Sequence, residues 1–139
     1  MRIFVIDGHG GKIGKSLIEA IKKQWPKAHI IAIGTNSLAT AAMLKAAPSE
    51  AATGENPVVV CAPRADVIIG PIGILVADAL LGEVTPRMAV AVGQSPAEKI
   101  LIPVNRCNQR VAGVGERSAS ELIEDAMRLL LEAMASPRE

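Results

Sequence analysis

A glycine-rich segment near the start of the chain has the residue types that can hold a phosphate group. Residues 7–14 read Asp-Gly-His-Gly-Gly-Lys-Ile-Gly, directly after the apolar run 3–6 and directly before a helical pattern. The glycines at 8, 11 and 14 keep a GxxGxxG spacing. In such a strand–turn–helix unit the first glycine allows a tight turn, the second lets a phosphate approach the backbone, and the third lets the helix lie close to the strand. Amides at the helix N-terminus would then face the anion. The segment predicts a phosphate or nucleotide site, and a purely structural turn is the alternative.

Asp7 is the acidic residue of this segment and stands just before the first glycine. A carboxylate beside a pyrophosphate costs energy unless a cation intervenes. Asp7 could therefore hold magnesium through water, act as a base, or cap the glycine turn, and we favour the cap.

Other catalytic arrangements are sparse. His9 and Cys107 are both expected on the loop edge, which would allow a Cys–His pair, but a free cysteine is more often a small buried residue. Catalytic residues therefore stay unassigned. The chain has two histidines and two cysteines, widely separated, which predicts no metal site.

Apolar strands and helical patterns alternate along the chain. Strands are predicted at 2–7, 29–33, 50–53, 66–70, 88–93 and 99–104, and helices at 12–24, 37–46, 73–82 and 119–135. This alternation implies parallel strands joined by helical crossovers, and the continuously apolar strands imply a sheet buried on both faces. We therefore expect an α/β chain with a three-layer, Rossmann-like fold, a mainly parallel, doubly wound sheet and a central first strand. Its length predicts a single domain over residues 1–139.

Residues 57–61, Pro-Val-Val-Val-Cys, fit either a strand or a short helix. The β-branched side chains favour a strand, whereas Asn56 could cap a helix that has Pro57 at its first position. A strand here would lie only about six residues from the next one, too near for a helical crossover. We favour the short helix.

Small polar and glycine-rich loops follow the predicted strands, whereas ordinary surface segments precede them. Ligands of open parallel sheets bind at the carboxyl ends of the strands, beside the topological switch point. These loops therefore predict a small-molecule site, although helix capping and chain turning explain many of the residues one by one. The candidate ligand-binding residues are Asp7, Gly8, His9, Gly10, Gly11, Lys12, Ile13, Gly34, Thr35, Asn36, Ser37, Gly54, Glu55, Asn56, Gly70, Pro71, Gly73, Gln94, Ser95, Asn105 and Arg106. Arg106 is the strong cation of the predicted edge and a candidate anion contact.

The end of the second strand bears on the identity of the ligand. Enzymes that prefer NAD usually have an acid there to hold the ribose hydroxyls. Residues 34–37 read Gly-Thr-Asn-Ser instead, and their hydroxyls and amide could accept a 2′-phosphate with help from Lys12 or Lys15. The predicted ligand is a small anionic molecule, and the cofactor stays open between NADP and another nucleotide.

The composition argues against several partners. Fifteen basic residues against 14 acidic ones give a formal charge of +1, which provides no basic field for nucleic acid. The aromatic residues are only Phe4 and Trp25, so a base-stacking surface is not expected. No stretch reaches the roughly 18 uninterrupted apolar positions of a membrane span, and the N-terminus does not resemble a signal peptide. With at most one cysteine pair, a reducing, cytoplasmic setting is predicted.

The helix predicted at 119–135 is apolar over more than one stripe. It starts with the capping box Ser118-Ala119-Ser120-Glu121. A helix apolar over so much of its circumference needs a second surface to cover it. A homodimer through this helix is one such surface, and loops of the same chain around 46–54 and 111–114 are the other. Its apolar residues are Leu122, Ile123, Ala126, Met127, Leu129, Leu130, Leu131 and Met134.

Six strings of the sequence resemble a bacterial family of small proteins that is known only as a domain of unknown function. They are IDGHGGKIG, IGTNSLAT, ATGENPVVV, DVIIGPIGI, AVGQS and PVNRCN. This resemblance covers nearly the whole chain and implies a cytoplasmic bacterial protein of Rossmann-like build, with no activity attached. The glycine pattern is also similar to extended short-chain dehydrogenases over about the first 40 residues. The chain has no tyrosine, so the Tyr-x-x-x-Lys pair of those enzymes and their type of hydride transfer are excluded.

Together these patterns predict a nucleotide- or phosphometabolite-binding protein with its ligand at the carboxyl edge of the sheet. Whether the protein is an enzyme stays open. The alternative is a non-catalytic oligomeric sensor or interaction module, favoured by the broad apolar final helix, the low net charge and the lack of a convincing nucleophile–base pair.

Overall fold

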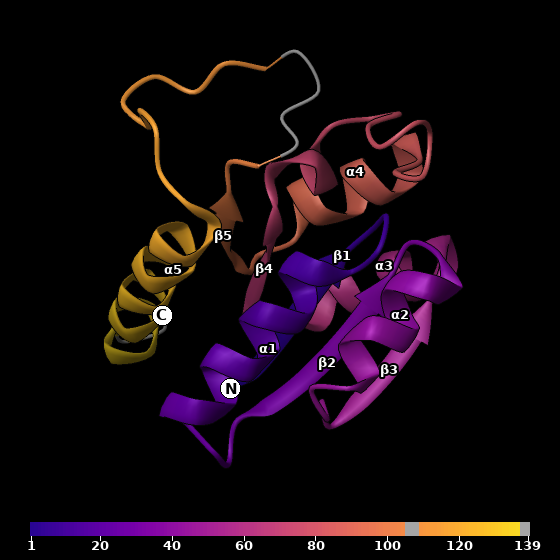
Figure 1. Ribbon diagram of the computed structural model, residues 1–139. Helices are drawn as coiled ribbons and strands as arrows, with labels where there is room; N and C mark the ends of the chain where they lie inside the picture. Colours follow the sequence, from indigo (N-terminus) through magenta and orange to yellow (C-terminus); the bar gives the residue numbers. More distant parts are fainter. Residues whose placement is uncertain (105–108, 137–139) are drawn as a thin grey trace.

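The computed structural model describes residues 1–104 and 109–136, and a parallel sheet with helices on both faces forms its centre (Figure 1). Five strands run in the order β3-β2-β1-β4-β5, and every neighbouring pair is parallel. They are β1 (Arg2–Asp7), β2 (His29–Gly34), β3 (Glu50–Thr53), β4 (Val67–Pro71) and β5 (Glu98–Ile102). The predicted three-layer α/β fold with a doubly wound parallel sheet and a central first strand is confirmed.

Helices connect the strands and cover both faces. They are α1 (Lys12–Gln24), α2 (Ser37–Leu44), α3 (Glu55–Cys61), α4 (Pro86–Gln94) and α5 (Ala119–Ala135), with short 3₁₀ helices η1 (Ala62–Arg64) and η2 (Ile72–Leu75). Among the described residues, no helix combines the length and apolar character that a membrane span requires.

Successive side chains of β1 enter two different hydrophobic cores, which is why the strand is apolar without interruption. Ile3 and Val5 pack with residues of α1 and α5 on one face. Phe4 and Ile6 pack with residues of α3 and α4 on the other face. The central strand therefore anchors both helical layers, and its carboxyl end is held at a fixed place between them.

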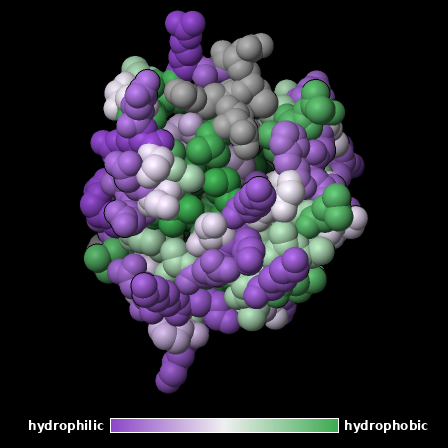
Figure 2. All heavy atoms as spheres, viewed as in Figure 1, coloured by the Kyte–Doolittle hydropathy of each residue, from purple (hydrophilic) through white to green (hydrophobic). Residues whose placement is uncertain are grey.

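The final helix is covered in part by its own chain, with Leu122, Ile123, Leu129 and Met134 half-buried. The capping box is present: Ser118 Oγ accepts a hydrogen bond from Glu121 N, and Glu121 Oε1 accepts one from Ser118 N, each at 3.2 Å. α5 packs against α1 and β5, and a groove of about 420 Å³ separates part of it from residues 111–114. Figure 2 shows apolar side chains gathered in the middle of this view, within a mostly polar outer surface. Leu130 is fully buried, whereas the neighbouring Leu131 is 51% exposed.

The segment after β4 differs from the sequence prediction. The helix predicted at 73–82 is wrong, because the chain forms η2 and then an irregular loop over 76–85. The strand predicted at 88–93 is also wrong, because these residues belong to α4. Thr85 caps α4 by accepting a hydrogen bond from Met88 N at 3.2 Å, and Pro86 occupies the first helical position. Its buried residues recur at helical spacing, not in strand alternation.

The remaining elements follow the sequence prediction with small shifts at their ends. The short helix favoured at 57–61 is confirmed as α3, but its cap is Gly54 and not Asn56, so the helix begins two residues earlier and Pro57 is its third residue. α2 ends two residues early at Leu44, and β5 covers 98–102 instead of 99–104.

Gly70 is required by the contact between β4 and β1. A Cβ at Gly70 would lie 2.1 Å from the carbonyl oxygen of Ile6, which is fixed in the central strand. We expect Gly70→Ala to lower the free energy of unfolding by about 1–3 kcal/mol. Gly73→Ala is the matched control, because a Cβ there meets Ala79 at an ordinary 3.6 Å. Urea denaturation checks both variants, and equal effects would contradict the steric account.

Candidate functional site

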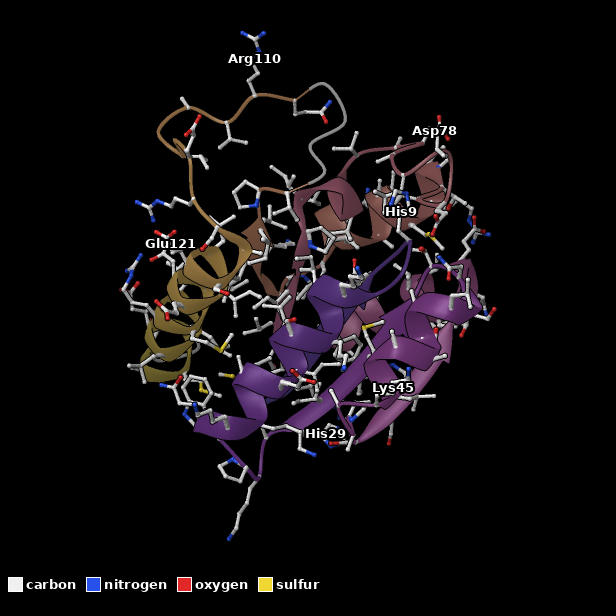
Figure 3. The ribbon with its side chains drawn as sticks, in the orientation of Figure 1. His9, His29, Lys45, Asp78, Arg110 and Glu121 are labelled. Atoms are coloured by element: carbon white, nitrogen blue, oxygen red, sulfur yellow. The ribbon has the colours of Figure 1, made fainter. Side chains whose placement is uncertain are left out.

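The sheet order places a topological switch point between β1 and β4. From β1 the chain proceeds outward through β2 and β3, and it then crosses to β4 and β5 on the other side. The loops that leave β1 and β4 therefore diverge and create a crevice at the carboxyl edge. His9 and Asp78 lie at this end of the molecule, whereas His29 lies at the opposite end (Figure 3).

Asp7 holds the turn between β1 and α1. Its Oδ1 accepts a hydrogen bond from Gly8 N at 2.8 Å, and its Oδ2 accepts one from Gly14 N at 2.7 Å. The side chain thus caps the turn and the first turn of α1, which agrees with the cap favoured from the sequence. Burial raises the pKa of Asp7 above its ordinary value, against the lowering effect of the hydrogen bonds from Gly14 and Gly8. No cluster suited to a metal ion occurs among the described residues.

The glycines of the turn are needed for contacts within the protein. A Cβ at Gly14 would lie 2.9 Å from Asp7 Cβ, which confirms the close approach predicted between helix and strand. A Cβ at Gly11 would lie 2.6 Å from the carbonyl oxygen of Ala39 in α2. Gly11, with φ of 73°, is therefore required by the packing of α1 on α2, and its predicted role in admitting a phosphate stays a prediction. Gly10 is the glycine of this turn whose added Cβ would meet no described atom within 4 Å.

Glu83, on the loop after β4, reaches over the glycine turn. Its Oε1 accepts hydrogen bonds from His9 N at 3.0 Å, Thr35 Oγ1 at 2.8 Å and Asn36 Nδ2 at 2.5 Å. Its Oε2 lies 3.6 Å from His9 Nε2, and the side chain is 27% exposed. Partial desolvation raises the pKa of Glu83, but the hydrogen bonds from Thr35, Asn36 and His9 together bring it below its ordinary value.

The residues after β2 hold their positions through further hydrogen bonds. Asn36 Oδ1 caps α2 by accepting from Ala39 N at 2.8 Å, and Asn36 Nδ2 also donates to His9 O at 3.0 Å. Thr35 N donates to Asp7 O at 2.9 Å. Gly34 leaves room for Thr40, whose Oγ1 would lie 2.2 Å from an added Cβ. The loops after β1, β2 and β4 are thus joined in one network.

Further residues line the same edge without contacting Glu83. Thr40 and Thr53, which were not among the predicted site residues, have their Oγ1 atoms 2.7 Å apart at the end of β3. Glu55, in the first turn of α3, pairs with Arg87 of α4 at 3.1 Å. The residues that belong to helix starts or to the buried end of β4 are Lys12, Ile13, Ser37, Asn56, Gly70, Pro71 and Gly73.

Two predicted positions lie elsewhere, and two more fall outside the described residues. Because α4 carries the chain back across the sheet, Gln94 and Ser95 lie at its amino edge, and the placement predicted for them is wrong. Ser95 is buried there, and its hydroxyl donates to the carbonyl oxygen of Ala62 at 2.6 Å. Asn105 and Arg106, together with Cys107, lie outside the described residues, so the predicted Cys–His pair and anion contact stay predictions.

Glu83 and Arg87 were missed from the sequence. The strand predicted at 88–93 implies that residues 85–87, just before it, lie at the amino edge of the sheet. The pair Thr85-Pro86 is a helix-start signal, and reading it as one would have moved this segment to the carboxyl edge.

The chain belongs to the family described as Domain of unknown function (DUF3842), whose model matches residues 2–135. This match confirms the resemblance to an uncharacterised family. Among solved structures, the chain is similar to a dodecameric FMN-dependent UbiX-like decarboxylase from Escherichia coli O157:H7, with 10% identity and a TM-score of 0.48 over 99% of this chain and 96% of that chain. So distant a similarity carries no inference about the ligand, and neither match is a short-chain dehydrogenase. No curated protein matches the chain significantly.

Asp7→Asn tests the buried cap. One of the two backbone amides would face a side-chain N–H in place of an acceptor, so we expect the free energy of unfolding to fall by about 1–3 kcal/mol at neutral pH. Because the pKa of Asp7 is raised in the folded protein, the part of its contribution that depends on protonation is fully present below the unfolded pKa and is lost as the pH rises through the folded pKa, while the two accepted hydrogen bonds stay. The free energy of unfolding of the wild type should therefore exceed that of the variant most at acidic pH.

Urea denaturation over a pH series measures this difference. Asp78→Asn, the same substitution at an exposed position, is the control and should leave the pH dependence unchanged. An advantage of the wild type that grows as the pH rises would contradict the role of burial.

Proposed function

We propose that this DUF3842 member binds a nucleotide or another phosphorylated metabolite at the carboxyl edge of its sheet. The observation that carries the proposal is the meeting of three loops, after β1, β2 and β4, at the switch point of the sheet. Open parallel sheets receive their ligands in this crevice.

The charges and donors of the edge support an anionic ligand. The first turn of α1 contains no acidic residue and includes Lys12 and Lys15, and the positive end of the helix dipole favours a negative group nearby. The backbone amide of His9 and the side chains of Thr35 and Asn36 add donors at the neighbouring loops. Donors of this kind, next to a glycine turn, suit phosphate oxygens.

The proposal concerns binding, and no reaction is assigned to the site. Asp7, the buried acid of the turn, has both oxygens engaged by backbone amides, so it is poorly placed to act as a base. The alternative function, a non-catalytic sensor, uses the same site and differs in the fate of the ligand. A bound nucleotide that is recovered unchanged after long incubation with candidate substrates would favour the sensor.

Thermal denaturation with NAD(H), NADP(H), ATP, GTP and related metabolites tests the proposed function. A ligand at 100 times its dissociation constant should stabilise the fold by about 2.7 kcal/mol. Gly10→Val should abolish this shift without lowering the melting temperature of the free protein, because its side chain would enter open space over the turn.

Gly93→Ala is the matched control for Gly10→Val. The added methyl group would lie on α4 in ordinary contact with Leu75 at 3.8 Å, and the ligand-induced shift should be kept. The proposed function is lost if no member of a broad panel changes the melting temperature of the wild type.

A second proposal is self-association through α5, and it rests on the half-exposed Leu131 beside the buried Leu130. Twofold contacts are the commonest closed assembly, and an aliphatic contact would gain roughly 25 cal/mol per Å² before the costs of association.

Leu131→Glu should give a monomer in sedimentation, whereas Leu38→Glu, at a leucine of α2 that is 73% exposed, should not. A wild-type monomer at tens of micromolar, on the order of the concentrations at which weak contacts fail, would refute the dimer.

A further inference from the structure

We propose that the three donors around Glu83 form a pocket for a phosphate group, and that the Glu83 carboxylate occupies this pocket until a ligand replaces it. The donors are His9 N, Thr35 Oγ1 and Asn36 Nδ2. This inference rests on the proposed function and deepens it by naming the anion pocket and its internal occupant.

The first argument is the convergence of all three donors on one oxygen. A backbone amide, a hydroxyl and a side-chain amide lie within 3.0 Å of Glu83 Oε1. A carboxylate oxygen and a phosphate oxygen make the same kind of charge-assisted hydrogen bond with such donors. The lowered pKa of Glu83 agrees with a donor set that favours negative charge at this point. The set would accept one oxygen of a phosphate group in the same way.

The second argument is that the residues carrying the donors are held by contacts other than Glu83. Asn36 is fixed because its Oδ1 caps α2 and its Nδ2 also bonds His9 O. The backbone of Thr35 is fixed by its hydrogen bond to Asp7 O. The pocket is therefore built by the loops after β1 and β2, and the loop after β4 supplies only the occupant.

The third argument is the conformation of the loop that carries Glu83. Asp78, Leu80 and Leu81 have φ values of 64°, 57° and 56°, which residues other than glycine rarely adopt. Strained backbone of this kind is typical of ligand clamps and switch segments. The loop is also closed on itself, since Asp78 N donates to Val84 O at 2.7 Å. This hydrogen bond holds residues 78–84 together as one closed loop.

Leu80 of the same loop covers the glycine turn. A Cβ at Gly8 would lie 2.7 Å from Leu80 Cδ1, and Leu80 is only 3% exposed. A phosphate on the turn would meet both the Leu80 side chain and the Glu83 charge. Because two anions cannot share one small donor set, phosphate binding requires Leu80 and Glu83 to move away together.

Binding of inorganic phosphate to Glu83→Ala tests the pocket. With its occupant removed, the variant should bind phosphate about tenfold more tightly than the wild type, or better, as expected when a charged competitor for three donors is lost. Isothermal titration at constant ionic strength measures the affinity. Adding Thr35→Val, which removes the hydroxyl but keeps the shape, should reverse the gain.

Asp78→Asn is the matched control, because it removes one negative charge from the same loop and asparagine tolerates the left-handed backbone. The phosphate affinity of Asp78→Asn should stay within about twofold of the wild-type affinity. If Glu83→Ala binds phosphate no better than Asp78→Asn, or more weakly than the wild type, the pocket is refuted. If Glu83→Ala does not fold, Glu83→Gln gives the same comparison with the same two outcomes.

The failure of this inference differs from the failure of the proposed function. If a nucleotide stabilises the wild type but Glu83→Ala gains no phosphate affinity, the proposed function is supported and the pocket is refuted. If Glu83→Ala gains phosphate affinity but no nucleotide stabilises any form, the pocket is supported and nucleotide binding is refuted.

Discussion

The carboxylate of Asp7, buried between β1 and α1, fixes the glycine turn from which the loop after β2 and the contacts of Glu83 take their positions. It ties the first amide of the turn to the third residue of α1, so the glycine segment has one closed conformation. The backbone carbonyl of the same residue receives the amide of Thr35, which sets the loop after β2 beside the turn. The negative charge also lies near the positive end of the α1 dipole, which offsets part of its desolvation. A buried charge held in this way favours a structural role over a reactive one.

The sequence was most informative where periodicity and capping agree. Helix α1 was predicted to the residue, because an apolar stripe on Leu17, Ile18 and Ile21 is bounded by the glycine turn and by Pro26. Helix α5 was predicted equally well through its capping box. The strand predicted at 88–93 was wrong because a short apolar run fits a strand and a buried helix alike. Only the preceding Thr85-Pro86 distinguishes the two. The left-handed loop before α4 has no sequence signal, since three of its four left-handed residues are not glycine.

Errors in the predicted site follow from the two mistaken elements after β4, the helix predicted at 73–82 and the strand predicted at 88–93. A helix in place of a strand moves its end from one edge of the sheet to the other, which is why Gln94 and Ser95 were assigned to the wrong edge. The helix predicted at 73–82 hid Glu83, because a helix there would carry the chain to the amino edge before residue 83. The residues expected after β1 and β2 do meet in the structure, because the carboxyl ends of adjacent parallel strands are neighbours by geometry. The contact between Glu83 and His9 spans 74 positions of the chain, and only the packing of the loop over the turn creates it.

An internal carboxylate in a phosphate pocket would have two physical consequences. Hydrogen-bond donors that lose water without gaining an acceptor raise the free energy of the folded protein. Glu83 supplies that acceptor when no ligand is bound. Any ligand must then displace a charged group together with a buried leucine, so its apparent affinity is reduced by the fraction of molecules in which the loop is closed. A phosphate group, with more charge and more acceptor oxygens than a carboxylate, can repay this cost. A neutral nucleoside cannot, because it offers no comparable replacement for the negative oxygen that it removes. The loop after β4 would thus select for phosphorylated ligands by competition at the donors, before any contact with the rest of the ligand discriminates among them.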